Sequence, residues 1–131
     1  MMDKKLIEKY LKIYPQITDE IDRLDSEIKR AIDRKHICQE ASIPEAQKKP
    51  MLESIEETFE ICSMDYREAI LAKCRIDREM RWLSEKQKKI IELRFWKEPE
   101  LVEWSEVAKA LNFHRSYVER IYRKVLREMI S

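Results

Sequence analysis

The sequence contains no glycine, and this absence excludes several kinds of site. Loops that cradle phosphates and tight hairpin turns of the primed types both depend on residues with positive φ, which glycine adopts most readily. The 131 residues include only four prolines, and 40% of them are charged. Leucine, isoleucine, glutamate, lysine and arginine, which favour helices, are abundant. We therefore predict an all-α protein without the common nucleotide-binding loops.

Cysteine and histidine are also scarce, with three and two residues. Cys38, Cys62 and Cys74 lack the spacing of metal ligands, and an odd number does not form a complete set of disulfides. His36 and His114 lie in different regions, without a nucleophile or ligand cluster nearby. Since no signal peptide or long apolar segment is evident, we expect a cytoplasmic protein with free thiols and no membrane association. We expect no catalytic residue, no metal and no cofactor.

The first region, from Asp3 to about His36, carries an apolar stripe that one proline interrupts. Pro15 predicts a short helix, a break, and a second helix from about Ile17, with Thr18 or Asp19 as its cap. The stripe consists of Leu6, Tyr10, Leu11, Ile13, Tyr14, Ile17, Ile21, Leu24, Ile28, Ala31 and Ile32. The apolar periodicity fades from residue 37 to residue 50. Pro44 and Pro50 interrupt this segment, which predicts a loop. Pro50 suits the first turn of the helix that follows.

A second long helix is predicted from about Met51 to Leu83, because its apolar residues are alternately three and four positions apart. This is a heptad seam, typical of a coiled coil. It comprises Leu52, Ile55, Phe59, Cys62, Tyr66, Ala69, Lys73, Ile76, Met80 and Leu83. Such a stripe needs a partner. The stripe from Ile17 to Ile32 supplies one if the chain folds back as a hairpin, and the same helix of a second subunit is the alternative. We favour the hairpin, with homodimerisation in addition.

The segment from Ser84 to Ser131 is predicted to form a separate domain, with residues 1–83 as the long-helix region. Ser84 and Gln87 have the spacing of a capping box, which starts a new helix. Its apolar face is Ile90, Ile91, Leu93, Phe95 and Trp96, and the next helix carries Trp104, Val107 and Leu111.

A sharp turn is expected after this next helix. Ala108 is small enough for another helix to cross closely. Asn112, four residues later, tolerates the left-handed conformation that ends a helix. Phe113 is expected to plug the corner, and a further helix begins near Arg115. These features predict a helix-turn-helix.

The last helix is predicted to present a basic side to solvent. At 100° per residue, the apolar positions Val118, Ile121, Val125 and Met129 face inward, and Ser116, Arg120, Arg123 and Arg127 face outward. A recognition helix presents such a face to the major groove of duplex DNA. From Ser84 onward the chain has eleven Lys and Arg residues against eight Asp and Glu. Because this excess is small, a monomer is expected to bind DNA weakly, which implies a dimer or a second protein partner.

Three stretches of this domain resemble region 4 of bacterial sigma factors. They are Leu83 to Phe95, and Trp104 to Ala108 followed by Arg115 to Leu126. The whole layout resembles small phage-encoded regulators of the ArpU/RinA type, which implies a phage or prophage regulator of transcription. The sigma pattern implies base contacts at Arg115, Ser116, Glu119 and Arg120, and phosphate contacts at Arg123, Lys124 and Arg127.

Within this interpretation, Arg115 and Arg120 are the best candidates to pair with guanine. Glu119 has two interpretations: it accepts a hydrogen bond from cytosine, or it forms an ion bridge between Arg115 and Arg123. Two other functions remain open. One is a phage DNA-packaging component that assembles through its long helices. The other is an adaptor that binds RNA polymerase without touching DNA.

Overall fold

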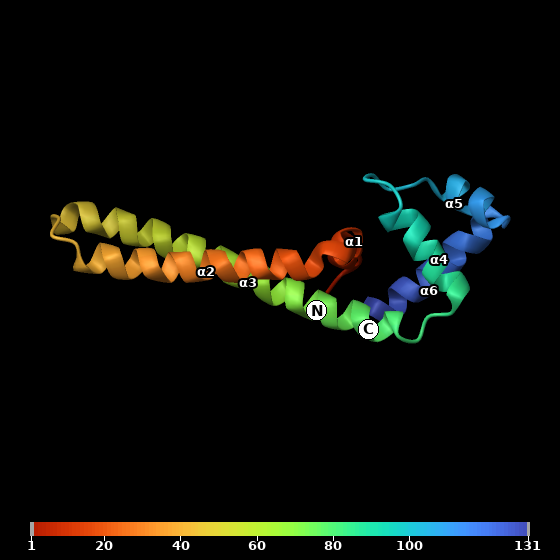
Figure 1. Cartoon of the computed structure of the whole chain (residues 1–131), viewed down its shortest axis with the longest axis horizontal. Helices are drawn as coiled ribbons and strands as arrows, with labels where there is room; N and C mark the ends of the chain where they lie inside the picture. The colour runs from red at the N-terminus through yellow and green to blue at the C-terminus, as the bar shows by residue number, and fades with distance from the viewer. Residues whose placement is uncertain (1, 131) are drawn as a thin grey trace. The chain divides into compact units, whose positions relative to one another are not determined.

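The computed structural model describes residues 2–130 and is all-α, as predicted, with no strand among those residues. Its elements are α1 (Lys4–Ile13), η1 (Tyr14–Gln16), α2 (Ile17–Glu40), α3 (Glu45–Met80), α4 (Glu85–Ile91), η2 (Glu92–Trp96), α5 (Trp104–Leu111) and α6 (Arg115–Ile130) (Figure 1). Within these described residues, no helix is long and apolar enough to cross a membrane.

The contacts divide the chain into two compact units, one of residues 17–70 and one that combines residues 1–16 with 71–131. This division differs from the predicted boundary between residues 83 and 84. The reason is that α1, although far away in the sequence, packs against α6 and η2. The last ten residues of α3 also belong to the unit that contains α6.

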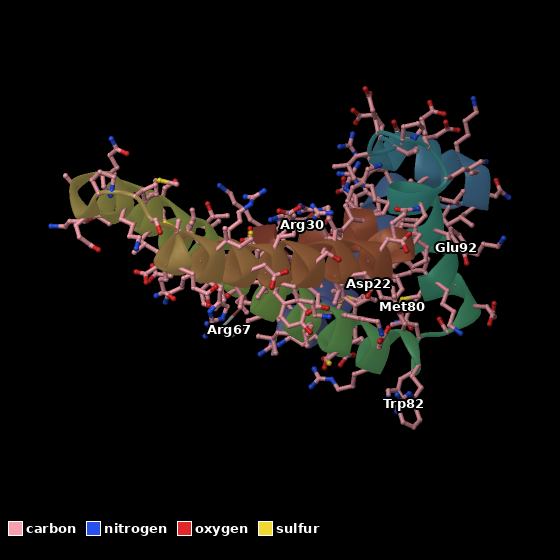
Figure 2. The ribbon with its side chains drawn as sticks, turned by 60° about the vertical axis from the view of Figure 1, so that its left-hand side comes forward. Asp22, Arg30, Arg67, Met80, Trp82 and Glu92 are labelled. Atoms are coloured by element: carbon pink, nitrogen blue, oxygen red, sulfur yellow. The ribbon has the colours of Figure 1, made fainter. Side chains whose placement is uncertain are left out.

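In the first unit, α2 and α3 run antiparallel as a hairpin within the chain (Figure 1). Lys35 of α2 forms an ion pair with Glu56 of α3 at 3.1 Å. Near the connection, Lys48 Nζ donates to the main-chain oxygen of Gln39 at 2.9 Å. Charged side chains, including Arg30 and Arg67, cover much of the hairpin (Figure 2). The intramolecular hairpin, favoured from the sequence, is therefore present.

The predicted loop from residue 37 to residue 50 is wrong, because only residues 41–44 connect the two helices. Helix α2 continues to Glu40 and buries Cys38, which is 4% exposed. The carbonyl of Pro44 accepts hydrogen bonds from the amides of Gln47 and Lys48, so α3 starts earlier than predicted. Pro50 consequently lies inside the helix rather than in its first turn. Because proline has no amide hydrogen, the main-chain bond from residue 50 to residue 46 is lost at this point of the helix.

The break at Pro15 is confirmed, since the one turn of 3₁₀-helix η1 separates α1 from α2. The predicted cap of α2 at Thr18 or Asp19 is not confirmed. Helix α2 begins at Ile17, so both residues lie inside its first turn. The start of α1 is capped by Asp3, whose carboxylate accepts from the amide of Leu6 at 2.9 Å.

The heptad seam of α3 is buried unevenly. Ala69 and Ile76 are completely buried, whereas Cys62 is half-buried and Phe59 is 37% exposed. Lys73, the polar residue of the seam, forms an ion pair with Asp77 at 2.7 Å. The seam is therefore less continuous than its spacing predicts.

The second unit has its core between α1, η2, α5 and α6. Ile7, Leu11, Phe95, Val107 and Val118 are at most 2% exposed. The indole nitrogen of Trp96 donates to the main-chain oxygen of Leu11 at 2.7 Å, and the Trp96 ring stacks on Tyr14. These contacts attach the N-terminal helix firmly to the C-terminal unit.

Tyr14 also connects this helix to α3, because its hydroxyl donates to the carboxylate of Asp77. Burial and the hydrogen bond to Asp77 raise the pKa of Tyr14 to about 12 from its ordinary value of 10.0. For Asp77, burial raises the pKa, but hydrogen bonds from Lys73 and Tyr14 outweigh it, so the pKa lies below its ordinary value.

Tyr14→Phe keeps the ring and removes only this hydroxyl, and we expect it to destabilise the unit by about 1–2 kcal/mol at neutral pH. Because the folded state raises the pKa of Tyr14, the hydroxyl stabilises fully below pH 10 and loses its effect as the pH rises towards about 12. Urea unfolding followed by tryptophan fluorescence at several pH values tests this. A stability difference between wild type and variant that stays constant up to pH 12 contradicts it.

Candidate nucleic-acid interface

The helix-turn-helix arrangement consists of α5, a turn at residues 112–114, and α6. Asn112 has φ 60° and ψ 42°, the left-handed conformation expected from the sequence. The amide of Phe113 donates to the carbonyl of Ala108 at 2.9 Å, and that of Asn112 to the carbonyl of Lys109 at 3.2 Å. These two bonds form a Schellman motif, which ends α5 without a glycine. The turn predicted at Asn112 is therefore confirmed.

The inner side of α6 is held by an aromatic cluster. Tyr122 lies 4.8 Å from the ring centre of Trp104 and 5.7 Å from that of Phe95. Its hydroxyl donates to the carboxylate of Glu8 in α1 at 2.8 Å. Burial, together with this bond to Glu8, raises the pKa of Tyr122 far above its ordinary value. Buried positions of α6 are Val118, Tyr122, Val125, Leu126 and Met129.

The predicted inward set of α6 is mostly right: Val118, Val125 and Met129 are buried and Ile121 is half-buried. Tyr122 and Leu126 are buried as well, and the sequence analysis missed both. A helix that packs against three others, α1, α4 and α5, buries a wider stripe than one apolar row, which explains the difference.

The opposite side of α6 is exposed and basic, as predicted. Ser116, Arg120, Arg123, Lys124 and Arg127 are exposed on this side. Arg115 is exposed in the first turn of the helix, and Glu119 is half-exposed. All seven predicted site residues therefore lie on one helix with their side chains accessible. We call this surface the basic face of α6.

Glu119 forms part of the predicted ion bridge. The Nε atom of Arg115 lies 3.0 Å from its carboxylate. Arg123 does not reach that carboxylate; its Nε donates to the main-chain oxygen of Glu119 at 3.4 Å. The carboxylate therefore orients Arg115 alone.

The prediction that Phe113 plugs the corner is wrong. Its side chain is 37% exposed and packs edge-to-face against Tyr117, with ring centres 5.2 Å apart. Lys86 of α4 covers both rings, with its Nζ 5.2 Å from each centre and donating to the Tyr117 hydroxyl at 2.9 Å. The corner needs no plug, because Val107 and Ala108 already fill the contact between α5 and α6.

Lys4 of α1 extends the basic surface beyond α6. It lines a groove of about 500 Å³ together with Arg120, Arg123, Arg127 and two apolar residues. Lys4 was not predicted as a site residue, because no local pattern in the sequence indicates that α1 packs beside α6. Lys86 was equally missed, although it lies inside the capping box that the sequence did identify.

If the groove follows a phosphate backbone, Lys4→Ala should weaken binding to specific and random duplexes by the same factor. The slope of log affinity against log salt concentration should become shallower by about 0.9, the value for one lost phosphate contact. Lys5→Ala is the matched control, since Lys5 is exposed on the same helix but does not line the groove. Titrations at several salt concentrations measure both slopes, and equal slopes for the two variants contradict the role of Lys4.

Neither a family model, nor a curated protein, nor a solved structure matched this chain. Among residues 2–130 there is no group of three or more histidine, cysteine, aspartate or glutamate side chains that could hold a metal ion. The basic face of α6 and its surroundings are thus the best-defined candidate site.

Proposed function

We propose that this protein is a sequence-specific DNA-binding regulator of transcription that inserts α6 into the major groove. The observation that carries the proposal is the exposure of Ser116, Arg120, Arg123 and Arg127 on one side of a helix whose other side is buried. A helix that begins directly after a tight turn, with cations on its accessible face, has the chemistry of a recognition helix. The resemblance to sigma region 4 and to ArpU/RinA-type regulators supports a phage or prophage origin.

The contacts divide into two kinds in this proposal. Arg115 and Arg120, in the first half of α6, pair with guanine edges. Arg123, Lys124 and Arg127 lie further along the helix and, together with Lys4 of α1, neutralise phosphates. Ser116 donates to either a base or a phosphate.

We propose that the protein acts as a homodimer. The net charge of only +1 gives weak attraction to DNA for a single copy, and two copies double the number of phosphate contacts. Large apolar side chains on the surface of the hairpin support self-association, since Ile61 is 52% and Met64 is 60% exposed.

Selection of binding sites from random duplexes, at two salt concentrations, tests the proposal most directly. We expect one enriched motif, with two-fold symmetry if a dimer binds, and an affinity that falls steeply with salt. Absence of any duplex binding contradicts the proposal. Co-purification with RNA polymerase in that case favours the adaptor, and a ring of many subunits favours the packaging component.

A further inference from the structure

The exposure of Phe113 is the feature of this site that the proposed arginine contacts do not explain. A phenylalanine ring in water forgoes the stabilisation that its burial would bring. The Phe113 ring lies just before the start of α6, and the neighbouring Tyr117 ring is also partly accessible. Two adjacent, accessible aromatic rings at this position fit a ligand that carries an apolar group.

The two rings form one wall of a surface hollow with a volume of about 660 Å³. Ser116, Arg120 and Arg123, which belong to the basic face of α6, line the same hollow. The guanidinium carbon of Arg120 lies 5.6 Å from the centre of the Tyr117 ring. An apolar wall and a guanidinium that reads bases are therefore adjacent parts of a single surface.

Lys86 fixes the outer edge of this wall. Its ammonium group lies over both rings and donates to the Tyr117 hydroxyl. Two cations, Lys86 of α4 over the rings and Arg123 of α6 in the lining of the hollow, suit the phosphates that border a groove of duplex DNA. This charge pattern favours a nucleic acid as the occupant.

We propose that Phe113 and Tyr117 form a contact for the C5-methyl group of thymine, next to a guanine read by Arg120. The methyl group of thymine is the apolar group that the major groove displays, and aromatic and other apolar side chains recognise it there. The inference rests on the proposed function and adds a specificity determinant to it. It predicts a constrained thymine beside a guanine in the binding motif.

Replacement of thymine by deoxyuridine removes only that methyl group and leaves every hydrogen-bonding group in place. In duplexes carrying the selected motif, we expect one such replacement to weaken binding about fourfold, the effect of removing one buried methyl-sized group from an apolar contact. Phe113→Ala should bind the thymine and the deoxyuridine duplexes about equally. Because Phe113 is exposed, this variant is expected to remain folded, which circular dichroism checks.

Trp82→Ala is the matched control. Trp82 is another aromatic residue on the surface (Figure 2); it is 78% exposed and does not line the hollow. It should keep the preference for thymine. If wild-type protein binds thymine and deoxyuridine duplexes equally at every position, or if the motif contains no constrained thymine, the inference is overturned while DNA binding stands. An equal loss by Phe113→Ala on both duplexes also overturns it. Failure to bind any duplex overturns the proposed function itself.

Discussion

Arg120→Ala should lower the affinity for the selected DNA motif by about 5- to 150-fold, because one bidentate arginine–guanine contact discriminates by about 1–3 kcal/mol. Binding to random duplexes should fall much less, since only one cation is lost. The loss at the specific site should be accompanied by relaxed preference at one base pair. Titration of matched specific and random duplexes at one salt concentration measures both effects.

Arg67→Ala removes the same charge from the surface of the hairpin and is the control. We expect it to leave the ratio of specific to non-specific affinity unchanged. An Arg120→Ala variant that weakens both kinds of binding equally would place Arg120 on a phosphate and contradict its role in base recognition.

Arg115 provides a useful comparison with Arg120, because its guanidinium is already paired with Glu119. This pairing orients the side chain, but the exposed ion pair contributes little stability by itself. In the proposed complex, DNA would compete with Glu119 for hydrogen bonds from Arg115. The guanidinium of Arg120, in contrast, lies 5.6 Å from the centre of the Tyr117 ring.

Phe95→Ala should destabilise the unit that holds α6 by about 3–5 kcal/mol, which is most of the stability of a small unit. Phe95 is 2% exposed and packs against Tyr122, so its loss leaves a cavity beneath α6. All three tryptophans lie in this unit, so their fluorescence during urea unfolding reports its stability.

The same substitution at Phe113 is the matched control, because Phe113 is 37% exposed. We expect Phe113→Ala to change the free energy of unfolding by less than about 1 kcal/mol. A large destabilisation by Phe113→Ala together with a small one by Phe95→Ala would mean that Phe113 is the core residue, as the sequence pattern had predicted.

Several local features were predictable because they depend on neighbours in the sequence. The capping box at Ser84 and Gln87 forms as expected, with both reciprocal hydrogen bonds. Asn112 takes the left-handed conformation because few other residues do so without strain. The spacing of Val118, Val125 and Met129 correctly placed the basic face on the outside of α6. Each of these results follows from backbone geometry within a few residues.

Other features depended on contacts between distant segments, and the sequence did not indicate them. Nothing near Lys4 or Tyr10 shows that α1 packs beside α6, more than 100 residues later. Residues 1–16 were placed in the long-helix region of residues 1–83, because an apolar stripe does not specify its partner. The exposure of Phe113 was missed for a related reason: an aromatic residue after a turn fills the corner only if no other side chain does.

The amino-acid sequence by itself determined the helical class, the turn at Asn112 and the cationic side of α6, because capping, left-handed φ and helical periodicity act over one or two turns of chain. Tertiary structure alone decided that α1 joins the C-terminal unit, that Lys4 and Lys86 border the basic face, and that Phe113 and Tyr117 are accessible. Those outcomes depend on which apolar surfaces bury each other, and burial is non-directional and therefore leaves the choice of partner to the whole fold.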